Sequence, residues 1–153
     1  MNGISDPRST ERVSLALLIL RISLGVFLII WAVDKFVNVE PTSHIWQKFY
    51  HLQIGASASY VAGALELLLA AAVLLGLCRR IIYGIAFIVH AVSTFSTWNQ
   101  LLNPWAVVSG HHINILFHAS VPVLAGFVVL YLLRDWDKWS LSGCVCDKFE
   151  SLV

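Results

Sequence analysis

The stretch VSLALLILRISLGVFLIIWAV, residues Val13–Val33, decides the fold class of this chain. Its only charged residue is Arg21. About 20 apolar residues, at a rise of 1.5 Å each, form a helix as long as the ~30 Å hydrocarbon core of a bilayer. The stretch is longer than the apolar core of a cleaved signal peptide, and no A-x-A-like cleavage site follows it before Asp34. It therefore predicts a retained transmembrane helix.

Further apolar runs of similar length follow along the 153 residues. They are Ser57–Cys78, Ile81–Trp98 and His112–Leu133. The chain is 58% hydrophobic and 12% charged, whereas about a quarter of the residues of a soluble domain are charged. We therefore expect an all-α integral membrane protein, a four-helix bundle formed by residues 13–135. A loosely held leader, residues 1–12, precedes the bundle, and a tail, residues 136–153, follows it.

The basic residues predict the orientation of the bundle. Nine of the ten lie outside the first run, and seven of these fall in the leader, in the turn between the second and third runs, or in the tail. These seven are Arg8, Arg12, Arg79, Arg80, Arg134, Lys138 and Lys148. Lys35 and Lys48 fall on the opposite side. By the positive-inside rule, both termini are cytoplasmic. The stretch His44–His51, on the outer side, mixes aromatic and polar residues and predicts a short interfacial helix.

Arg21 and Glu66 are the ionisable residues nearest the middle of their runs, and such residues are costly in hydrocarbon. Arg21 lies slightly to the cytoplasmic side of the middle of the first run, and Glu66 slightly to the outer side of the middle of the second. Their depths differ by only about 5 Å, which two long side chains can bridge. We therefore expect a buried Arg21–Glu66 pair.

Helical spacing places polar or small residues on one face of every run. The four faces comprise Arg21, Gly25, Ala32 and Lys35; Ser59, Ala62, Gly63, Glu66 and Ala70; Tyr83, Ala86, His90, Thr94 and Thr97; and His111, Asn114, His118, Pro122 and Ala125. Small residues beside a charge favour close helix packing. We expect the four faces to enclose one polar interior containing Arg21, Glu66, His90, Asn114 and His118, with Lys35, His111 and His112 on its outer side.

The chemistry of this interior is left open by the sequence. It can be structural, with hydrogen bonds that hold the bundle together. Alternatively, it opens outward and binds a small ligand, a quinone headgroup or protons, since histidine exchanges protons near neutral pH. Haem between His90 and His118 is disfavoured, because the faces offer no gap for the macrocycle. A metal site formed by His44, His51, His111 and His112 has little support, since their spacing matches no known pattern.

The cysteines carry little additional information. Cys144 and Cys146 have the spacing C-x-C rather than the redox spacing C-x-x-C, and Cys78 is the third cysteine of the chain. Because a reducing cytoplasm disfavours structural disulfides, we expect none here.

The stretches Arg21–Phe36 (RISLGVFLIIWAVDKF) and Gly63–Arg80 (GALELLLAAAVLLGLCRR) resemble the DoxX-like membrane proteins. This family of small four-span bundles includes the membrane subunit of thiosulfate:quinone oxidoreductase. The resemblance covers roughly residues 13–135 and carries over to Arg21, Gly25, Lys35 and Glu66.

The resemblance implies a membrane subunit or anchor of a redox system in the bacterial inner membrane. Such a subunit has a protein partner, contacts quinone, and is an accessory protein rather than a self-sufficient enzyme. Two alternatives remain from the residues themselves: a small transporter or proton-conducting bundle that uses Glu66, His90 and His118, and a purely structural interaction protein. The substrate and the oligomeric state are left open, self-association included, and no basic cluster suggests nucleic-acid binding.

Overall fold

A computed structural model describes residues 7–106 and 113–141, and every regular element within these ranges is a helix. The elements are α1 (Pro7–Val37), α2 (Val39–Tyr50), α3 (Ala56–Leu75), α4 (Arg79–Ser96), α5 (Trp98–Leu102), the 3₁₀ helix η1 (Ile113–Ala119), α6 (Ser120–Leu132) and the 3₁₀ helix η2 (Arg134–Trp136). This confirms the all-α prediction for the described residues.

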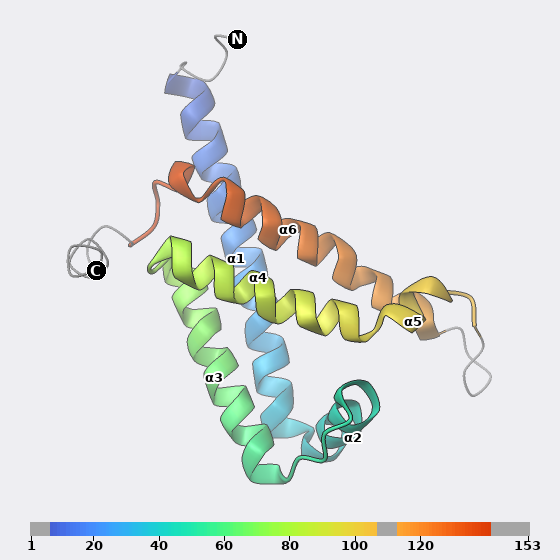
Figure 1. The fold of residues 1–153 in the computed structure, drawn as a ribbon. Coiled ribbons are helices and arrows are strands. Elements are labelled where there is room, and N and C mark those ends of the chain that lie inside the picture. The colour runs from blue at the N-terminus through green and yellow to red at the C-terminus, as the bar shows by residue number, and fades with distance from the viewer. Residues whose placement is uncertain (1–6, 107–112, 142–153) are drawn as a thin grey trace.

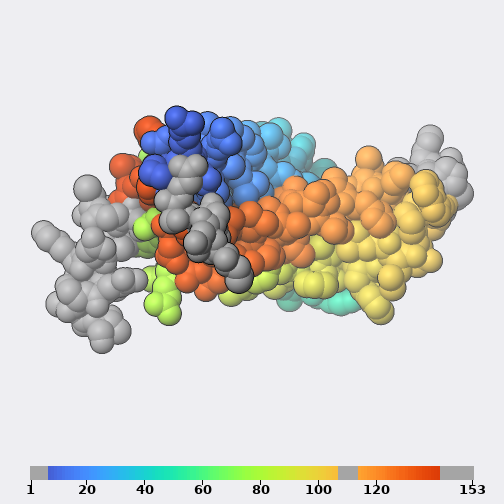
Figure 2. Space-filling view, turned by 90° about the horizontal axis from the view of Figure 1, so that it is seen from above, coloured from blue at the N-terminus to red at the C-terminus, as the bar shows by residue number. Residues whose placement is uncertain are grey.

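The long helices pack as two antiparallel pairs, α1 with α3 and α4 with α6 (Figure 1). The pairs meet where α3 turns into α4 and where residues 134–141 follow α6; we call this region the closed end. From there the two pairs diverge. Helix α2 lies at the far end of the α1–α3 pair, and α5 and η1 lie at the far end of the α4–α6 pair; we call this side of the molecule the open end. Figure 2 shows α6 beside the first half of α1 and then leaving it alongside α4 and α5.

Small residues allow α1 and α3 to approach closely, as the sequence predicts. A Cβ added to Gly63 would lie 2.7 Å from the Phe36 ring and 3.1 Å from the carbonyl oxygen of Ala32. A Cβ added to Gly25 would lie 2.5 Å from the side chain of Leu74. Because backbones come together only where side chains are small, these glycines determine the contact between the two helices.

All five residues of the face predicted for the third run are buried, namely Tyr83, Ala86, His90 and Thr94 in α4 and Thr97 just after it. The face predicted for the last run is wrong, because His118, Pro122 and Ala125 are exposed. Pro122 cannot donate a backbone hydrogen bond, and its ring clashes with the carbonyl four residues earlier. The chain before it is a 3₁₀ helix, which has three residues per turn. A count of 3.6 residues per turn therefore groups residues that do not lie on the same side of this segment. In α6 the buried residues are Phe127 and Leu130.

Three of the described helices are long and apolar enough to cross a membrane, namely α1, the segment Asn114–Leu132 and α3. The remaining predicted span corresponds to α4, whose first turn contains Arg79 and Arg80. The prediction of a loose leader is wrong for residues 7–12, because α1 begins at Pro7. Proline suits the first turn of a helix, where its missing N–H needs no partner.

A tight turn joins α3 to α4, as expected from the sequence. Gly76 ends α3 with a φ of 65°, and the Leu77 amide donates to the carbonyl of Ala72. This left-handed position favours glycine, which has no Cβ to clash. Space is also restricted there, because a Cβ on Gly76 would lie 2.3 Å from a guanidinium nitrogen of Arg21.

Candidate functional site

Arg21 lies at the closed end, and its partner is Asp137 rather than Glu66. The guanidinium Nη1 lies 2.9 Å from Asp137 Oδ2, and the two side chains are 3% and 0% exposed. Tyr83 donates its hydroxyl to the same oxygen at 2.7 Å, and Arg21 Nη2 donates to the carbonyl of Trp139 at 2.8 Å. The prediction of an Arg21–Glu66 pair is therefore wrong.

Arg21 and Glu66 lie farther apart along the helices than predicted. Arg21 lies level with Gly76, just after the end of α3, whereas Glu66 lies ten residues earlier in α3, about 15 Å away at 1.5 Å per residue. Glu66 pairs instead with Lys35, near the other end of the α1–α3 contact. Both of these side chains are about 15% exposed, so their pair is less buried than the one at the closed end.

His90 lies in the contact between the two helix pairs. Its ring packs 5.4 Å from the rings of Phe27 and Phe127, and its Nε2 lies 3.1 Å from the carbonyl oxygen of Ser120. The side chain is 6% exposed. These contacts give His90 a packing role between α1, α4 and α6.

The two remaining predicted interior residues lie elsewhere. Asn114 is buried at the open end, where its side-chain amide donates to the carbonyl of Asn103 at 3.0 Å. His118, in η1, is exposed. His111 and His112 lie outside the described residues. The expected single polar interior is thus divided among the closed end, the Lys35–Glu66 pair, the His90 contact and the open end.

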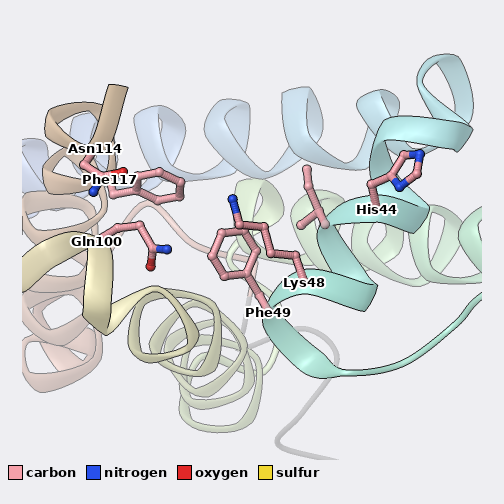
Figure 3. Close-up of a pocket in the computed structure, with 7 residues that line it drawn as sticks. His44, Lys48, Phe49, Gln100, Asn114 and Phe117 are labelled. Carbon is pink, nitrogen blue, oxygen red and sulfur yellow. The ribbon is translucent and has the colours of Figure 1, made fainter. Parts of the chain in front are cut away.

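A partly open cavity of about 320 Å³ lies at the open end. Its lining comes from α2, α5 and η1: His44, Ile45, Lys48, Phe49, Gln100, Asn114 and Phe117. In Figure 3, the side chains of Lys48 and Phe49 on α2 face those of Gln100 and Phe117, and His44 lies one turn earlier on α2. The rings of Phe49 and Phe117 meet edge to face at 5.9 Å between centroids. The cavity thus combines aromatic surface with an ammonium, an imidazole and two amides.

Helix α2 provides four of the seven residues that line the cavity. The predicted interfacial segment His44–His51 is helical up to Tyr50, within α2 (Val39–Tyr50). Lys48 and His44, one turn apart, both line the cavity, while His51 ends the helix in a left-handed conformation with a φ of 56°.

Among the described residues, no three histidine, cysteine or acidic side chains group in a way that could hold a metal ion.

One cysteine, Cys78, differs from the expectation that the chain has no disulfide. Cys78, in the turn between α3 and α4, is disulfide-bonded, so the expectation of no disulfide is wrong. Cys144 and Cys146 lie outside the described residues.

Sequence reasoning missed Asp137, Phe49, Gln100 and Phe117. Asp137 was overlooked because it lies in a polar segment whose hydropathy gives no sign of burial. A usable signal was the count of buried charges: an arginine in an apolar run needs an acid, and Asp137 and Asp135 are the acids that follow the last run most closely. The cavity residues come from three separate segments, and the sequence indicated only one of these, the mixed aromatic and polar stretch of residues 44–51.

Comparison with known proteins assigns the family. The family model described as DoxX matches residues 16–100, more than half of the chain, including Arg21, Lys35 and Glu66. The match ends at α5, so η1, α6 and Asp137 lie beyond it. No curated protein and no solved structure shows significant similarity to the chain. On the strength of the family match and the apolar helices, this chain is a multi-pass membrane protein of the DoxX family.

Proposed function

We propose that this protein is a membrane subunit or anchor of a redox system and contacts a quinone headgroup in the cavity at the open end. The observation that supports this proposal most directly is the lining of that cavity. Small-molecule sites are mostly apolar, with a few polar groups that orient the ligand. The cavity volume, about 320 Å³, lies at the lower end of the usual range and suits a single ring with its substituents.

The lining offers complementary groups for both redox forms of a quinone. The oxidised ring has two carbonyls that accept hydrogen bonds, and the Lys48 ammonium and the Gln100 amide are donors. The reduced ring has two hydroxyls that donate, and the side-chain oxygen of Asn114 can accept because its nitrogen is already bonded to Asn103. Phe49 and Phe117 supply edges and faces for the ring itself.

The alternative of a proton-conducting bundle has less support from the geometry. It requires Glu66, His90 and His118 to form a path. Instead, Glu66 is paired with Lys35, His90 packs between two phenylalanine rings, and His118 is exposed. The purely structural alternative accounts for the buried network at the closed end but gives no role to the lined cavity.

We further propose that α4 is a fourth membrane span and that both termini face the cytoplasm of a bacterial inner membrane. In this arrangement the closed end, with Arg79, Arg80 and Arg134, lies inside, which agrees with the positive-inside rule. Single cysteines introduced at Arg80 and Gln53, in a variant lacking the native cysteines, test this arrangement. A membrane-impermeant maleimide added to intact cells should label only the cysteine at position 53, and labelling of both would contradict four spans in this orientation.

Binding of a short-chain quinone tests the proposed function. The purified protein, in detergent micelles, is titrated with the quinone, and quenching of tryptophan fluorescence gives the dissociation constant. Phe117→Ala and Gln100→Leu should each weaken binding by about threefold to tenfold, which corresponds to the loss of a ring contact or a hydrogen bond. Ile30→Ala, on the exposed face of α1, is the matched control and should bind as the parent does.

The partner is identified separately, by affinity purification of the native complex from membranes in mild detergent. A redox enzyme that co-purifies repeatedly supports the role of a subunit or anchor. Its repeated absence, together with unchanged quinone binding in Phe117→Ala, would refute the proposal.

A further inference from the structure

Three arginines lie at the closed end, where α4 begins and α6 ends. They are Arg79 and Arg80, in the first turn of α4, and Arg134, which starts η2. Figure 1 shows the start of α4 beside the end of α6. Arg80 is exposed, Arg79 and Arg134 are half-buried, and the exposed acid next to them in the sequence is Asp135. Positive charge therefore predominates on the surface formed by these three arginines, which we call the arginine surface.

Hydrogen bonds hold two of the three arginines in place. Arg79 Nη1 donates to the carbonyls of Arg134 and Asp137, at 2.7 and 2.9 Å, and so joins α4 to the segment after α6. Arg134 Nη1 donates to the carbonyl of Tyr131 at 2.7 Å, and the guanidinium carbon lies 4.7 Å from the centroid of the Tyr131 ring. Because these contacts position two charges before any ligand binds, they lower the entropic cost of binding.

The Tyr131 ring also shows that Arg80 and Arg134 lie on the same side of the molecule. A Cβ added to Gly84 would lie 3.4 Å from this ring, so the ring packs against the face of α4 that contains Gly84. Arg80 lies four residues before Gly84, hence on the same face and one turn nearer the start of the helix. Arg80 and Arg134 thus lie at the same edge of the α4–α6 contact, where both long side chains can reach one anion.

The surroundings of these arginines favour a lipid as the source of that anion. Arg134 lies two residues after Leu132, where an apolar segment long enough to span a membrane ends, so it lies at the depth of the headgroups. Leu132 is 64% exposed, and Ile81, directly after Arg80, is 54% exposed. A phospholipid has both a phosphate for the arginines and acyl chains for this apolar surface, whereas a free phosphate uses only the arginines.

We propose that the arginine surface binds the phosphate of an anionic phospholipid, whose acyl chains lie along the exposed apolar residues of α4 and α6. This inference uses the membrane assignment of the chain and is independent of the quinone site and of the direction of insertion. Arg80 and Arg134 donate to the phosphate oxygens, which match the planar guanidinium group. The bound lipid joins α4 to the segment after α6, so it should stabilise the folded protein.

The experiment titrates the full chain, in micelles of a neutral detergent, with phosphatidylglycerol. Native mass spectrometry counts the bound lipid and gives its dissociation constant, and the midpoint of thermal unfolding reports stabilisation. Phosphatidylcholine with the same acyl chains and inorganic phosphate are the comparison probes. Phosphatidylglycerol should bind most tightly and should raise the unfolding midpoint more than either of them.

Variants of single arginines test the position of the site. Arg80→Gln should weaken binding of phosphatidylglycerol about fivefold, the factor expected for one basic side chain near an anionic membrane surface. Arg80→Lys keeps the charge and should retain most of the affinity. Arg12→Gln is the matched control, because Arg12 is also exposed but lies two residues before Ser14, on the opposite side of α1 from the contact with Lys138. It should bind the lipid as the parent does.

Several results would overturn the inference. Equal stabilisation by phosphatidylcholine would mean that the headgroup charge is not recognised. Equal binding of inorganic phosphate would mean a site for a free anion rather than for a lipid. Equal losses in Arg80→Gln and Arg12→Gln would mean that only the total charge of the protein matters. Quinone titration of the same variants separates these outcomes from a failure of the proposed quinone site, which lies at the open end.

Discussion

Replacement of Asp137 by Asn perturbs the buried network at the closed end with little change in side-chain size. The charge that faces Arg21 is lost, while the guanidinium stays 3% exposed in the same place. Removing one partner of a buried pair costs about 3–5 kcal/mol, because the other charge remains buried without compensation. The remaining side-chain oxygen can still accept from Tyr83, and Arg21 keeps its 2.8 Å bond to the carbonyl of Trp139. We therefore expect a loss of about 3 kcal/mol in the free energy of unfolding.

The assay is reversible unfolding in mixed detergent micelles, followed by circular dichroism and tryptophan fluorescence. Asp135→Asn, two residues earlier and exposed, is the control and should leave the unfolding midpoint unchanged. Adding Arg21→Met to Asp137→Asn removes the uncompensated charge, so the double variant should lose less stability than the sum of the two single losses. Strictly additive losses, or an Asp137→Asn variant as stable as the control, would refute the pairing.

Further predictions concern the other buried groups. Glu66→Gln should destabilise the protein less than Asp137→Asn, because its partner Lys35 is about 15% exposed; an equal or greater loss in the same unfolding assay would contradict this ranking. Gly76→Ala should lower the unfolding free energy by about 1–2 kcal/mol or more, since a left-handed residue gains a Cβ that meets a guanidinium. Gly55→Ala has open space around it and a negative φ, so it should lower the unfolding free energy by less, about 1 kcal/mol or below, through the weaker N-cap of α3. His90→Ala should destabilise the bundle by leaving a void between two rings, and a thermal midpoint equal to that of the parent protein would show that His90 has no packing role.

Helical periodicity predicted the close contacts of α1, α3 and α4 because these helices are regular. Gly25 and Gly63 lie where the two helices nearly touch, and His90 lies on the buried face of α4. The same counting failed at His118, since the 3₁₀ geometry before Pro122 changes the number of residues per turn. Local patterns thus predict a face only for as long as the helix keeps its pitch.

The partners of the charges could not be predicted from depth alone. Arg21 lies level with the end of α3, about ten residues of helix from the level of Glu66, and its acid comes from a polar segment that folds back after α6. Such a return depends on tertiary contacts, which hydropathy does not encode. Lys35, which the sequence placed on the same face as Arg21, is the residue that reaches Glu66.

The cavity at the open end depends on three segments that meet only in the folded chain. The sequence indicated a helix near residues 44–51, and α2 confirms it, but nothing in the local pattern placed Phe117 or Gln100 against that helix. In Figure 1, α2 lies at the far end of the α1–α3 pair and α5 at the far end of the α4–α6 pair. The cavity forms where side chains of α2, α5 and η1 meet, as the contact between the rings of Phe49 and Phe117 shows.

Photolabelling with a light-activated quinone analogue, followed by mapping of the labelled peptides, tests the proposed quinone contact most directly. The cavity predicts label on α2 near Lys48 and Phe49 and on η1 near Phe117, with competition by excess unlabelled quinone. Label that falls on the exposed faces of α1 or α3 instead, and that excess quinone does not displace, would contradict the account.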